Sequence, residues 1–295
     1  MDDYLKALCI ELHHIAKETE GKTLNTIYIG GGTPTTLEAE QMDRLLKTIT
    51  ENFDLSNVLE FTVEAGRPDS ITEEKLAVIR KYPVTRISIN PQTMQQKTLD
   101  LVGRNHTVAQ TKDAFYLARK LGFDNINMDL IAGLPGEDAS DMEDTLRQVE
   151  EMHPDSLTVH ALAIKRAARY GQEGRKQDLH SEISQMIMSA ADCAKRIGLQ
   201  PYYLYRQKNI AGNFENVGYA ELDKAGIYNI LIMEEKQTIL AAGAGASTKI
   251  LLKDPIRTDS GKEINLVRCE NVKNIMEYID RVDEMIERKG EWLWR

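Results

Sequence analysis

Three consecutive glycines, Gly30 to Gly32, follow a short apolar segment and precede Thr33 and Pro34. Glycine has no Cβ atom, so this backbone can approach a ligand closely and adopt positive φ angles. The spacing is not the G-x-G-x-x-G of dinucleotide-binding folds, and the lysine of a P-loop is missing. We therefore expect a glycine cradle that contacts a ligand through its backbone, with a plain strand-to-helix turn as the alternative.

Three polar side chains stand at or near the ends of the next apolar segments, namely Glu64, Gln92 and Asp129. A carboxylate inside an apolar run, such as that of Asp129, is costly to bury unless it is paired or hydrogen-bonded. Arg104 follows a short helical segment, and its guanidinium can hold a carboxylate through two N–H groups. For Glu64 the alternative is a salt bridge to Arg67 or Arg86. Together with the glycine cradle, this set suits a zwitterionic ligand that carries a sugar and an amino acid.

The elements that must position these residues alternate along the chain. Apolar or β-branched runs predict strands, and apolar positions that recur every three or four residues predict helices. The predicted strands span 25–30, 59–64, 84–90, 125–131 and 156–163. The predicted helices span 2–17, 37–50, 71–81, 108–121 and 140–152, with capping-box spacing in Thr35 and Glu38 and in Ser140 and Glu143. This alternation indicates βαβ units and a parallel sheet, whose carboxyl ends carry function.

The pattern changes near residue 165, where a basic stretch at 165–169 begins. After it we predict a helix at 179–197, strands at 202–206, 227–233 and 238–242, and a final helix with an apolar face from Val272 to Ile286. The sequence therefore predicts two domains, a barrel portion at 1–164 and a C-terminal α+β region at 165–295.

The chain has 295 residues and a formal net charge of −9. A nucleic-acid binder would present a basic face to phosphates, so the acidic balance argues against nucleic acid as a partner. No apolar run approaches the ~20 residues of a membrane helix, and the acidic N-terminus resembles no targeting signal. The three cysteines, Cys9, Cys193 and Cys269, are too far apart to form a disulfide framework. We predict a cytoplasmic protein without a membrane partner.

Six segments resemble motifs of the radical S-adenosylmethionine (SAM) superfamily, and within it of the oxygen-independent coproporphyrinogen III oxidase family. They are YIGGGTPTTL at 28–37, VEAGRP at 63–68, RISINPQTM at 86–94, LVGRN at 101–105, NMDLIAGLP at 127–135 and LTVHALA at 157–163. The stretch 202–220 resembles the coproporphyrinogen dehydrogenase HemZ-like branch, with ENVGYA at 215–220 where commoner branches read H-N-x-x-Y-W. The resemblance implies an α/β fold, a partial (β/α)6 TIM-like barrel.

The resemblance also implies a SAM site built from the predicted strand ends. Its members are Gly31, Gly32 and Thr33 at the methionine part, Glu64, Gln92, Arg104 and Asp129 at the amino, carboxylate or ribose groups, and Ala163 by the adenine. Family members bind a 4Fe-4S cluster through a C-x3-C-x2-C loop, and an electron from the cluster cleaves SAM to a 5′-deoxyadenosyl radical. This radical abstracts hydrogen from a propionate of coproporphyrinogen III, and decarboxylation leaves a vinyl group. The implied partners are coproporphyrinogen III or a related tetrapyrrole, and an electron donor such as flavodoxin or ferredoxin.

The sequence departs from the family in one segment, because it contains no C-x3-C-x2-C. We therefore assign no catalytic and no metal-ligating residue. In the family this loop follows the first barrel strand and precedes a helix like the one at 2–17. We expect the chain to be a C-terminal portion of a longer protein that begins after the cluster loop and lacks the first strand. Iron–sulfur clusters are held by cysteine thiolates, so this polypeptide alone is expected to be inert while keeping much of the SAM cradle.

Several alternatives remain open at this stage. The same branch includes haem chaperones, which keep the fold but bind haem, and the ENVGYA segment favours the oxidase over them. His160 ends the fifth predicted strand and could contact SAM or substrate, or be a satisfied core histidine. Arg206 and Lys208 could pair with substrate propionates or lie on the surface. Tyr202 and Tyr203 fit a strand by propensity alone.

Overall fold

The computed structural model describes residues 1–162, 176–205, 216–257 and 261–293, and of 176–180 it describes the backbone alone. The predictions for Ala163, for the basic stretch at 165–169, and for Arg206 and Lys208 therefore lie outside the described residues. The chain divides into two compact units. Unit 1 consists of Met1–Ile27, Leu37–Leu59 and Ile227–Arg295, and unit 2 consists of Tyr28–Thr36 and Glu60–Gly226. The predicted domain boundary at residue 165 stays a prediction.

Unit 2 is built on a sheet that has, within the described residues, the order β1-β2-β3-β4-β5-β7-β6. The strands are β1 Thr26–Ile29, β2 Glu60–Gly66, β3 Arg86–Ile89, β4 Ile126–Ala132, β5 Ser156–Ala161, β6 Gln200–Tyr205 and β7 Asn216–Ala220. Strands β2 to β5 are parallel to one another. Strand β7 pairs antiparallel with both β5 and β6. Of β1, only Tyr28 and Ile29 belong to unit 2. Parallel strands of this kind direct their carboxyl ends to one edge of the sheet.

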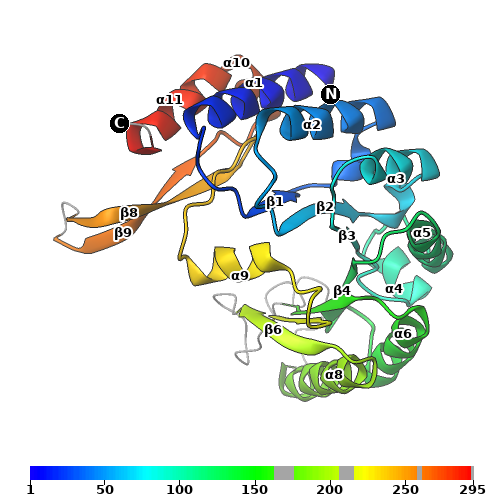
Figure 1. The fold of residues 1–295 in the computed structure, drawn as a ribbon. Helices are drawn as coiled ribbons and strands as arrows, with labels where there is room; N and C mark the ends of the chain where they lie inside the picture. The colour runs from blue at the N-terminus through cyan, green and yellow to red at the C-terminus, as the bar shows by residue number, and fades with distance from the viewer. Residues whose placement is uncertain (163–175, 206–215, 258–260, 294–295) are drawn as a thin grey trace. The chain divides into compact units, whose positions relative to one another are not determined.

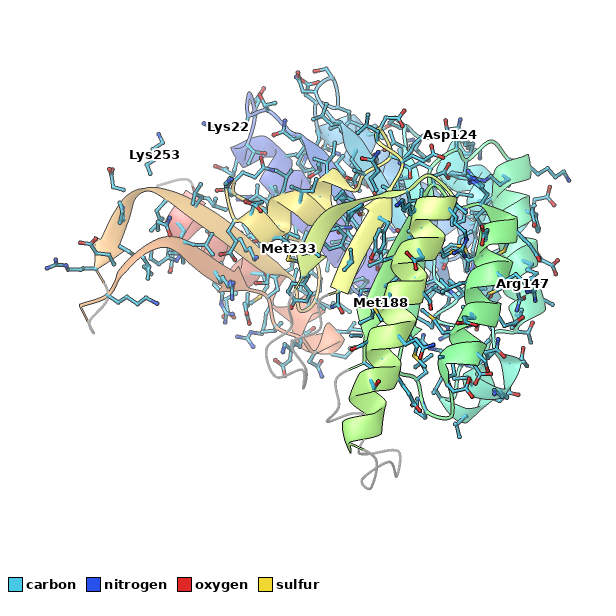
Figure 2. The ribbon with its side chains drawn as sticks, turned by 90° about the horizontal axis from the view of Figure 1, so that it is seen from below. Lys22, Asp124, Arg147, Met188, Met233 and Lys253 are labelled. Atoms are coloured by element: carbon cyan, nitrogen blue, oxygen red, sulfur yellow. The ribbon has the colours of Figure 1, made fainter. Side chains whose placement is uncertain are left out.

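Helices flank the strands of unit 2 on one side (Figure 1). They are α3 Glu73–Arg80, α4 Gln96–Leu101, α5 Val108–Lys120, α6 Ala139–Met152 and α8 Lys176–Arg196, with short 3-10 turns η1 Pro34–Thr36 and η2 Pro68–Ser70. Helices α6 and α8 pack on each other, and the exposed side chains Arg147 and Met188 project from them (Figure 2). One face of each strand supplies the buried core with residues such as Phe61, Ile87 and Met128.

Unit 1 combines segments from distant parts of the chain. Its elements are α1 Asp2–Glu18, α2 Ala39–Asn52, α9 Ile227–Glu234, the antiparallel pair β8 Ser247–Arg257 and β9 Glu263–Glu270, α10 Ile275–Asp280 and α11 Val282–Leu293. Helix α1 contacts α2, α10 and α11. Ala7 of α1 packs with Tyr278, Val282, Met285 and Ile286 in one buried cluster.

A fully buried ion pair lies beside this cluster. Glu11 and Lys289 are each 0% exposed, and their Oε1 and Nζ atoms are 2.5 Å apart. Glu11 also accepts hydrogen bonds from Tyr278 Oη, Asn271 Nδ2 and the Gly243 N–H at 2.6, 2.9 and 2.8 Å. Buried charges need such partners, because an unpaired one loses its hydration without compensation. The network ties the first helix of the chain to the last.

The predicted α/β fold is confirmed, and the five predicted strands and five predicted helices up to residue 163 all occur with shifted ends. Both capping boxes were predicted at the wrong residues. Helix α2 is capped by Glu38 with Gln41, while the Thr35 hydroxyl donates instead to the Ala65 carbonyl at 2.5 Å. Helix α6 is capped by Asp138, two residues before the predicted Ser140. In each case the helix begins beside an acidic residue whose side chain reaches the free N–H groups of the first turn.

The predictions after residue 200 were less accurate. The strand predicted at 227–233 is helix α9, and the one predicted at 238–242 forms only an isolated bridge between Ile239 and Lys249. A short run that is apolar throughout has no periodicity, so it does not distinguish helix from strand. The predicted final helix is divided at Arg281 into α10 and α11, and strands β7, β8 and β9 were not predicted. No helix among the described residues combines the length and apolar character needed to cross a membrane.

Candidate functional site

Strands β2 to β5 carry polar side chains on the face opposite the apolar core. We call this set the polar face; it consists of Thr62, Glu64, Arg86, Ser88, Asn127, Asp129, Ser156, Thr158 and His160. Side chains alternate along a strand, so every second residue faces the same way. Glu64 pairs in register with Ser88, Ser88 with Asn127, and Asn127 with Ser156. The polar residues therefore form continuous rows across the sheet.

Hydrogen bonds connect the polar face from one strand to the next. Asn127 Nδ2 donates to Ser88 Oγ at 3.2 Å and to Asp129 Oδ1 at 2.7 Å. Thr158 Oγ1 donates to Asn127 Oδ1 at 3.2 Å. The other Asp129 oxygen lies 4.0 Å from His160 Nε2, and the Asp129 side chain is 21% exposed. Asp129 thus has the partners that its carboxylate requires, and it keeps access to solvent or a ligand.

Glu64 lies beside the glycine cradle. Its Oε1 accepts a hydrogen bond from the Tyr28 hydroxyl, and its carboxylate also accepts from the Gly31 N–H. Burial raises the pKa of Glu64, and the hydrogen bond from Tyr28 is the largest effect that opposes this rise. The negative charge of Asp129 adds to the rise, and the Arg86 guanidinium opposes it. Glu64 and Asp129 therefore influence each other within one electrostatic site.

The cradle itself is open at two of its glycines. A Cβ atom added to Gly31 or Gly32 would meet nothing within 4 Å, and Gly31 has a φ of +87°. Gly30 differs, because its Cβ would lie 2.5 Å from Tyr28 Cε1 and 2.8 Å from Glu64 Oε2. The Thr33 carbonyl accepts from the Thr36 N–H and hydroxyl at 2.9 and 2.8 Å, which closes the turn after the glycines. The cradle thus offers free backbone beside a carboxylate.

Gln92 reaches the same edge of the sheet by an unusual backbone conformation. Its φ is +68°, which is uncommon for a residue with a side chain. Its N–H donates to the Asp129 carbonyl, and its own carbonyl accepts from the Ile131 N–H, each at 2.9 Å. The buried His106 ring donates to the Pro91 carbonyl at 3.2 Å and thereby supports this turn. The structure therefore brings Gln92 next to Asp129.

Arg104 is not joined to these residues. It is half-buried, its N–H donates to the Leu99 carbonyl at 2.9 Å, and within the described part of the chain its guanidinium has no ion pair with Glu64 or Asp129. Its nearest link to the site is His106, whose pKa is lowered mainly by burial and also by the charge of Arg104.

Comparison with known proteins identifies the kind of domain that carries this site. The sequence model of the Radical SAM superfamily matches residues 9–149. The chain carries a radical SAM domain. Proteins of this superfamily use SAM and a 4Fe-4S cluster.

The radical SAM domain has relatives of two kinds. The chain is 47% identical over 273 residues to the oxygen-independent coproporphyrinogen-III oxidase-like protein HemZ of Bacillus subtilis (strain 168), which covers 92% of this chain and 53% of that protein. It is 34% identical over 197 residues to the heme chaperone HemW of the same organism, covering 64% of this chain and 52% of that one. The chain thus spans about half the length of these curated relatives.

The solved structure of the Escherichia coli coproporphyrinogen III oxidase HemN, a radical SAM enzyme, has the same fold. Its TM-score is 0.72 at 24% sequence identity, and the match covers 100% of this chain and 64% of that one. The predicted α/β fold with a partial TIM-like barrel is therefore confirmed, and its parallel sheet is curled into a half-barrel. At this level of identity the similarity concerns the fold alone.

The three cysteines of the chain do not fit a 4Fe-4S cluster. Cys9 is half-buried on α1, with its Sγ 3.4 Å from Thr48 Oγ1, while Cys193 and Cys269 are buried. Burial raises the pKa of the Cys193 thiol to about 11. Among the described residues, no group of three or more histidine, cysteine or acidic side chains could hold a metal ion. We derive no step through the cluster for this chain.

Sequence reasoning missed part of the polar face of the radical SAM domain. Arg86 is 2% exposed, its Nη2 donates to Ser156 Oγ at 3.3 Å, and its buried Nε has no partner among the described residues. Its signal was the alternation R-I-S-I-N from Arg86 onward, repeated as N-M-D at 127–129 and S-L-T-V-H at 156–160. Alternation within a parallel strand indicates one polar face, because strands buried on both sides are continuously apolar.

Sequence reasoning also missed that Tyr203 lies beside the polar face. It stands opposite Gly218 of β7, and a Cβ added to Gly218 would lie 1.9 Å from Tyr203 Cε1. Its hydroxyl is hydrogen-bonded to the Thr158 side chain. Burial raises the pKa of Tyr203, and the charges of Tyr202 and Asp129 add to the rise. Tyr203 therefore extends the polar face as a neutral phenol.

Proposed function

We propose that this radical SAM domain belongs to an enzyme of porphyrin and haem biosynthesis. The reaction is the oxidative decarboxylation of coproporphyrinogen III to protoporphyrinogen IX. The observation that carries the proposal is the pairing of an open glycine cradle with Glu64, beside the second carboxylate Asp129. The 47% identity to a coproporphyrinogen-III oxidase-like protein supports the choice of substrate class.

The described residues fit SAM, which supplies the hydrogen-abstracting group of the reaction when it is bound. The open backbone at Gly31 and Gly32, with Thr33, receives the methionine part, because no side chain occupies that space. Glu64 accepts the amino group. Gln92 and Asp129, which are joined by one backbone hydrogen bond, contact the ribose or carboxylate groups.

Two more residues belong to this proposal. Arg104 binds the carboxylate of SAM after a movement of its side chain, since its guanidinium has no ion pair in the described part of the chain. Ala163 lies outside the described residues, and its assignment to the adenine stays a prediction. The chain alone does not complete the reaction, because its cysteines do not fit a cluster. The proposal also includes an electron donor such as flavodoxin or ferredoxin, and it places the protein in the cytoplasm.

The second candidate function is that of a haem chaperone. The 34% identity to HemW favours it, since that relative is a radical SAM homologue named for haem handling. The ENVGYA segment at 215–220 differs from the H-N-x-x-Y-W pattern of the commoner branches. Asn216 and Gly218 of this segment border the polar face, where Asn216 Oδ1 accepts from the Ala161 N–H at 3.0 Å. This difference at the site favours the oxidase.

Equilibrium titration of the purified chain with SAM, with coproporphyrinogen III under anaerobic conditions, and with haem tests both candidates. Asp129→Asn removes a charge from the polar face and should weaken SAM binding about tenfold or more, since hydrogen bonds to charged groups are worth about 1.5–3 kcal/mol. Asp124→Asn is the matched control, because Asp124 is 86% exposed and lies at the protein surface (Figure 2). We expect binding of SAM and coproporphyrinogen III that the control leaves unchanged.

Two outcomes would contradict the proposal. Stoichiometric, tight haem binding without affinity for coproporphyrinogen III would make the chaperone the better assignment. Equal SAM affinity of the Asp129→Asn and Asp124→Asn variants would show that the polar face does not bind SAM.

A further inference from the structure

Glu64 is held from two sides of the glycine cradle. The Tyr28 hydroxyl, from the end of β1, donates to Glu64 Oε1, and the Gly31 N–H donates to the same carboxylate. The side chain of Tyr28 and the backbone of Gly31 thus approach the Glu64 carboxylate from either side of Gly30 in the sequence. A carboxylate has about four lone-pair directions, so two remain for other donors.

Gly30 makes this arrangement possible. A Cβ at this position would lie 2.5 Å from Tyr28 Cε1, and 2.8 and 2.9 Å from Oε2 and Cδ of Glu64. The tyrosine ring and the carboxylate therefore occupy the space that a side chain at position 30 would need. The glycine is required here for close approach of these two groups.

We propose that Tyr28 is a positioning residue, which fixes the Glu64 carboxylate against Gly31 so that its remaining lone pairs accept an ammonium group. The ammonium is the amino group of SAM in the function proposed above, and to that extent the inference rests on the proposed function. Tyr28 touches neither the cofactor nor the reacting atoms in this role; it acts through Glu64.

The charges around Glu64 explain why it needs such support. Burial and the carboxylate of Asp129 both raise its pKa, while Tyr28, Gly31 and Arg86 lower it. Tyr28 remains a donor throughout the neutral range, because burial and then the charge of Glu64 raise its own pKa. A hydrogen bond to the ionised form favours that form, and only an ionised carboxylate attracts an ammonium.

The test is Tyr28→Phe, which keeps the ring and removes the hydroxyl. Tyr116→Phe is the matched control, since Tyr116 is 53% exposed on α5. SAM affinity is measured by calorimetry from pH 5 to pH 8 with the full chain. The Glu64 carboxyl is titrated separately, without ligand, by NMR of protein labelled at the glutamate carboxyl carbon, with Glu64→Gln assigning the signal.

We expect Tyr28→Phe to raise the midpoint of the Glu64 titration by about one pH unit. Its SAM affinity should be weaker by up to about tenfold at pH values below both midpoints, with a smaller loss at pH values above both midpoints, where Glu64 is ionised in both proteins. A loss of affinity that is uniform with pH, or an unchanged Glu64 titration, would overturn the inference. Absence of SAM binding by the wild-type chain, with the Glu64 titration still shifted in Tyr28→Phe, would refute the proposed cofactor and leave the positioning of Glu64 supported.

Discussion

Replacing Lys289 by methionine should strongly destabilise unit 1. The substitution keeps most of the length of the side chain and removes the ammonium group. Glu11 then keeps its other three donors but loses the only positive charge among its described hydrogen-bond partners, while both positions stay fully buried. Asn271 Oδ1 also loses the donor that lies 2.6 Å away.

The magnitude follows from the burial of both charges. Removing one partner of a buried ion pair leaves the other charge without compensation, which costs about 3–5 kcal/mol. The whole stability of a protein is only about 5–15 kcal/mol, so this single change removes a large part of it. With urea dependences of about 1–3 kcal/mol per molar, the unfolding midpoint should fall by roughly 1–5 M.

Urea unfolding followed by tryptophan fluorescence is a suitable assay. The only two tryptophans, Trp292 and Trp294, stand at the end of the chain, and Trp292 belongs to α11, the helix that carries Lys289. The signal therefore reports on the unit in which the substitution lies. Circular dichroism in parallel follows the helices of both units.

The double variant Glu11→Gln with Lys289→Met separates charge from packing. Its glutamine amide can donate to Asn271 Oδ1 in place of the ammonium. We expect its loss of stability to be smaller than the sum of the single losses by about 1–3 kcal/mol. A cost of less than about 1 kcal/mol for Lys289→Met, or strict additivity in the double variant, would refute the reasoning.

Three further predictions concern unit 2 and the cysteines. Because the pKa of Glu64 is raised in the folded state, its ionisation opposes folding as pH rises above the unfolded value of 4.5. Glu64→Gln should therefore have a higher melting temperature than wild type at pH 7, and the difference should vanish toward pH 4.5. The variant should also lose SAM binding. A melting temperature below that of wild type at pH 7 would contradict this prediction. Gly218→Ala should lower the free energy of unfolding, measured by chemical denaturation, by about 1–3 kcal/mol, because its Cβ would overlap the Tyr203 ring. Adding Tyr203→Ala to the same chain should recover part of that loss. Anaerobic reconstitution with iron and sulfide should give no stoichiometric 4Fe-4S absorbance, in wild type or in Cys9→Ser, and a full band would refute the cysteine argument.

The elements around the site could be predicted because their signals are local. Strand and helix alternate regularly up to β5. The glycines directly follow β1, and Glu64 and Asp129 are polar residues within the apolar runs of β2 and β4. The polar face needed one more step, the recognition that Arg86 and Ser88 alternate with apolar residues. That pattern is local as well, so it could have been found.

Other features depend on contacts that no local pattern encodes. The packing of Tyr203 on Gly218 requires the register between β6 and β7, and the sequence of the connecting segment at 206–215 does not fix that register. Helix α9 was mistaken for a strand, because its apolar residues occur on all sides. The pair Glu11 and Lys289 belongs to helices at opposite ends of the chain, and each residue alone resembles an ordinary surface charge.

The Glu11–Lys289 contact also has a consequence for how the protein is made. The two residues are 278 positions apart, and ribosomes add roughly 5–20 residues per second. Helix α1 therefore emerges roughly 14–56 seconds before the lysine that neutralises its buried carboxylate. During that interval the strands β2 to β7 of unit 2 are synthesised, while unit 1 is still unfinished. Unit 1 is thus completed only after unit 2 has been synthesised, and until then α1 lacks its contacts with α10 and α11.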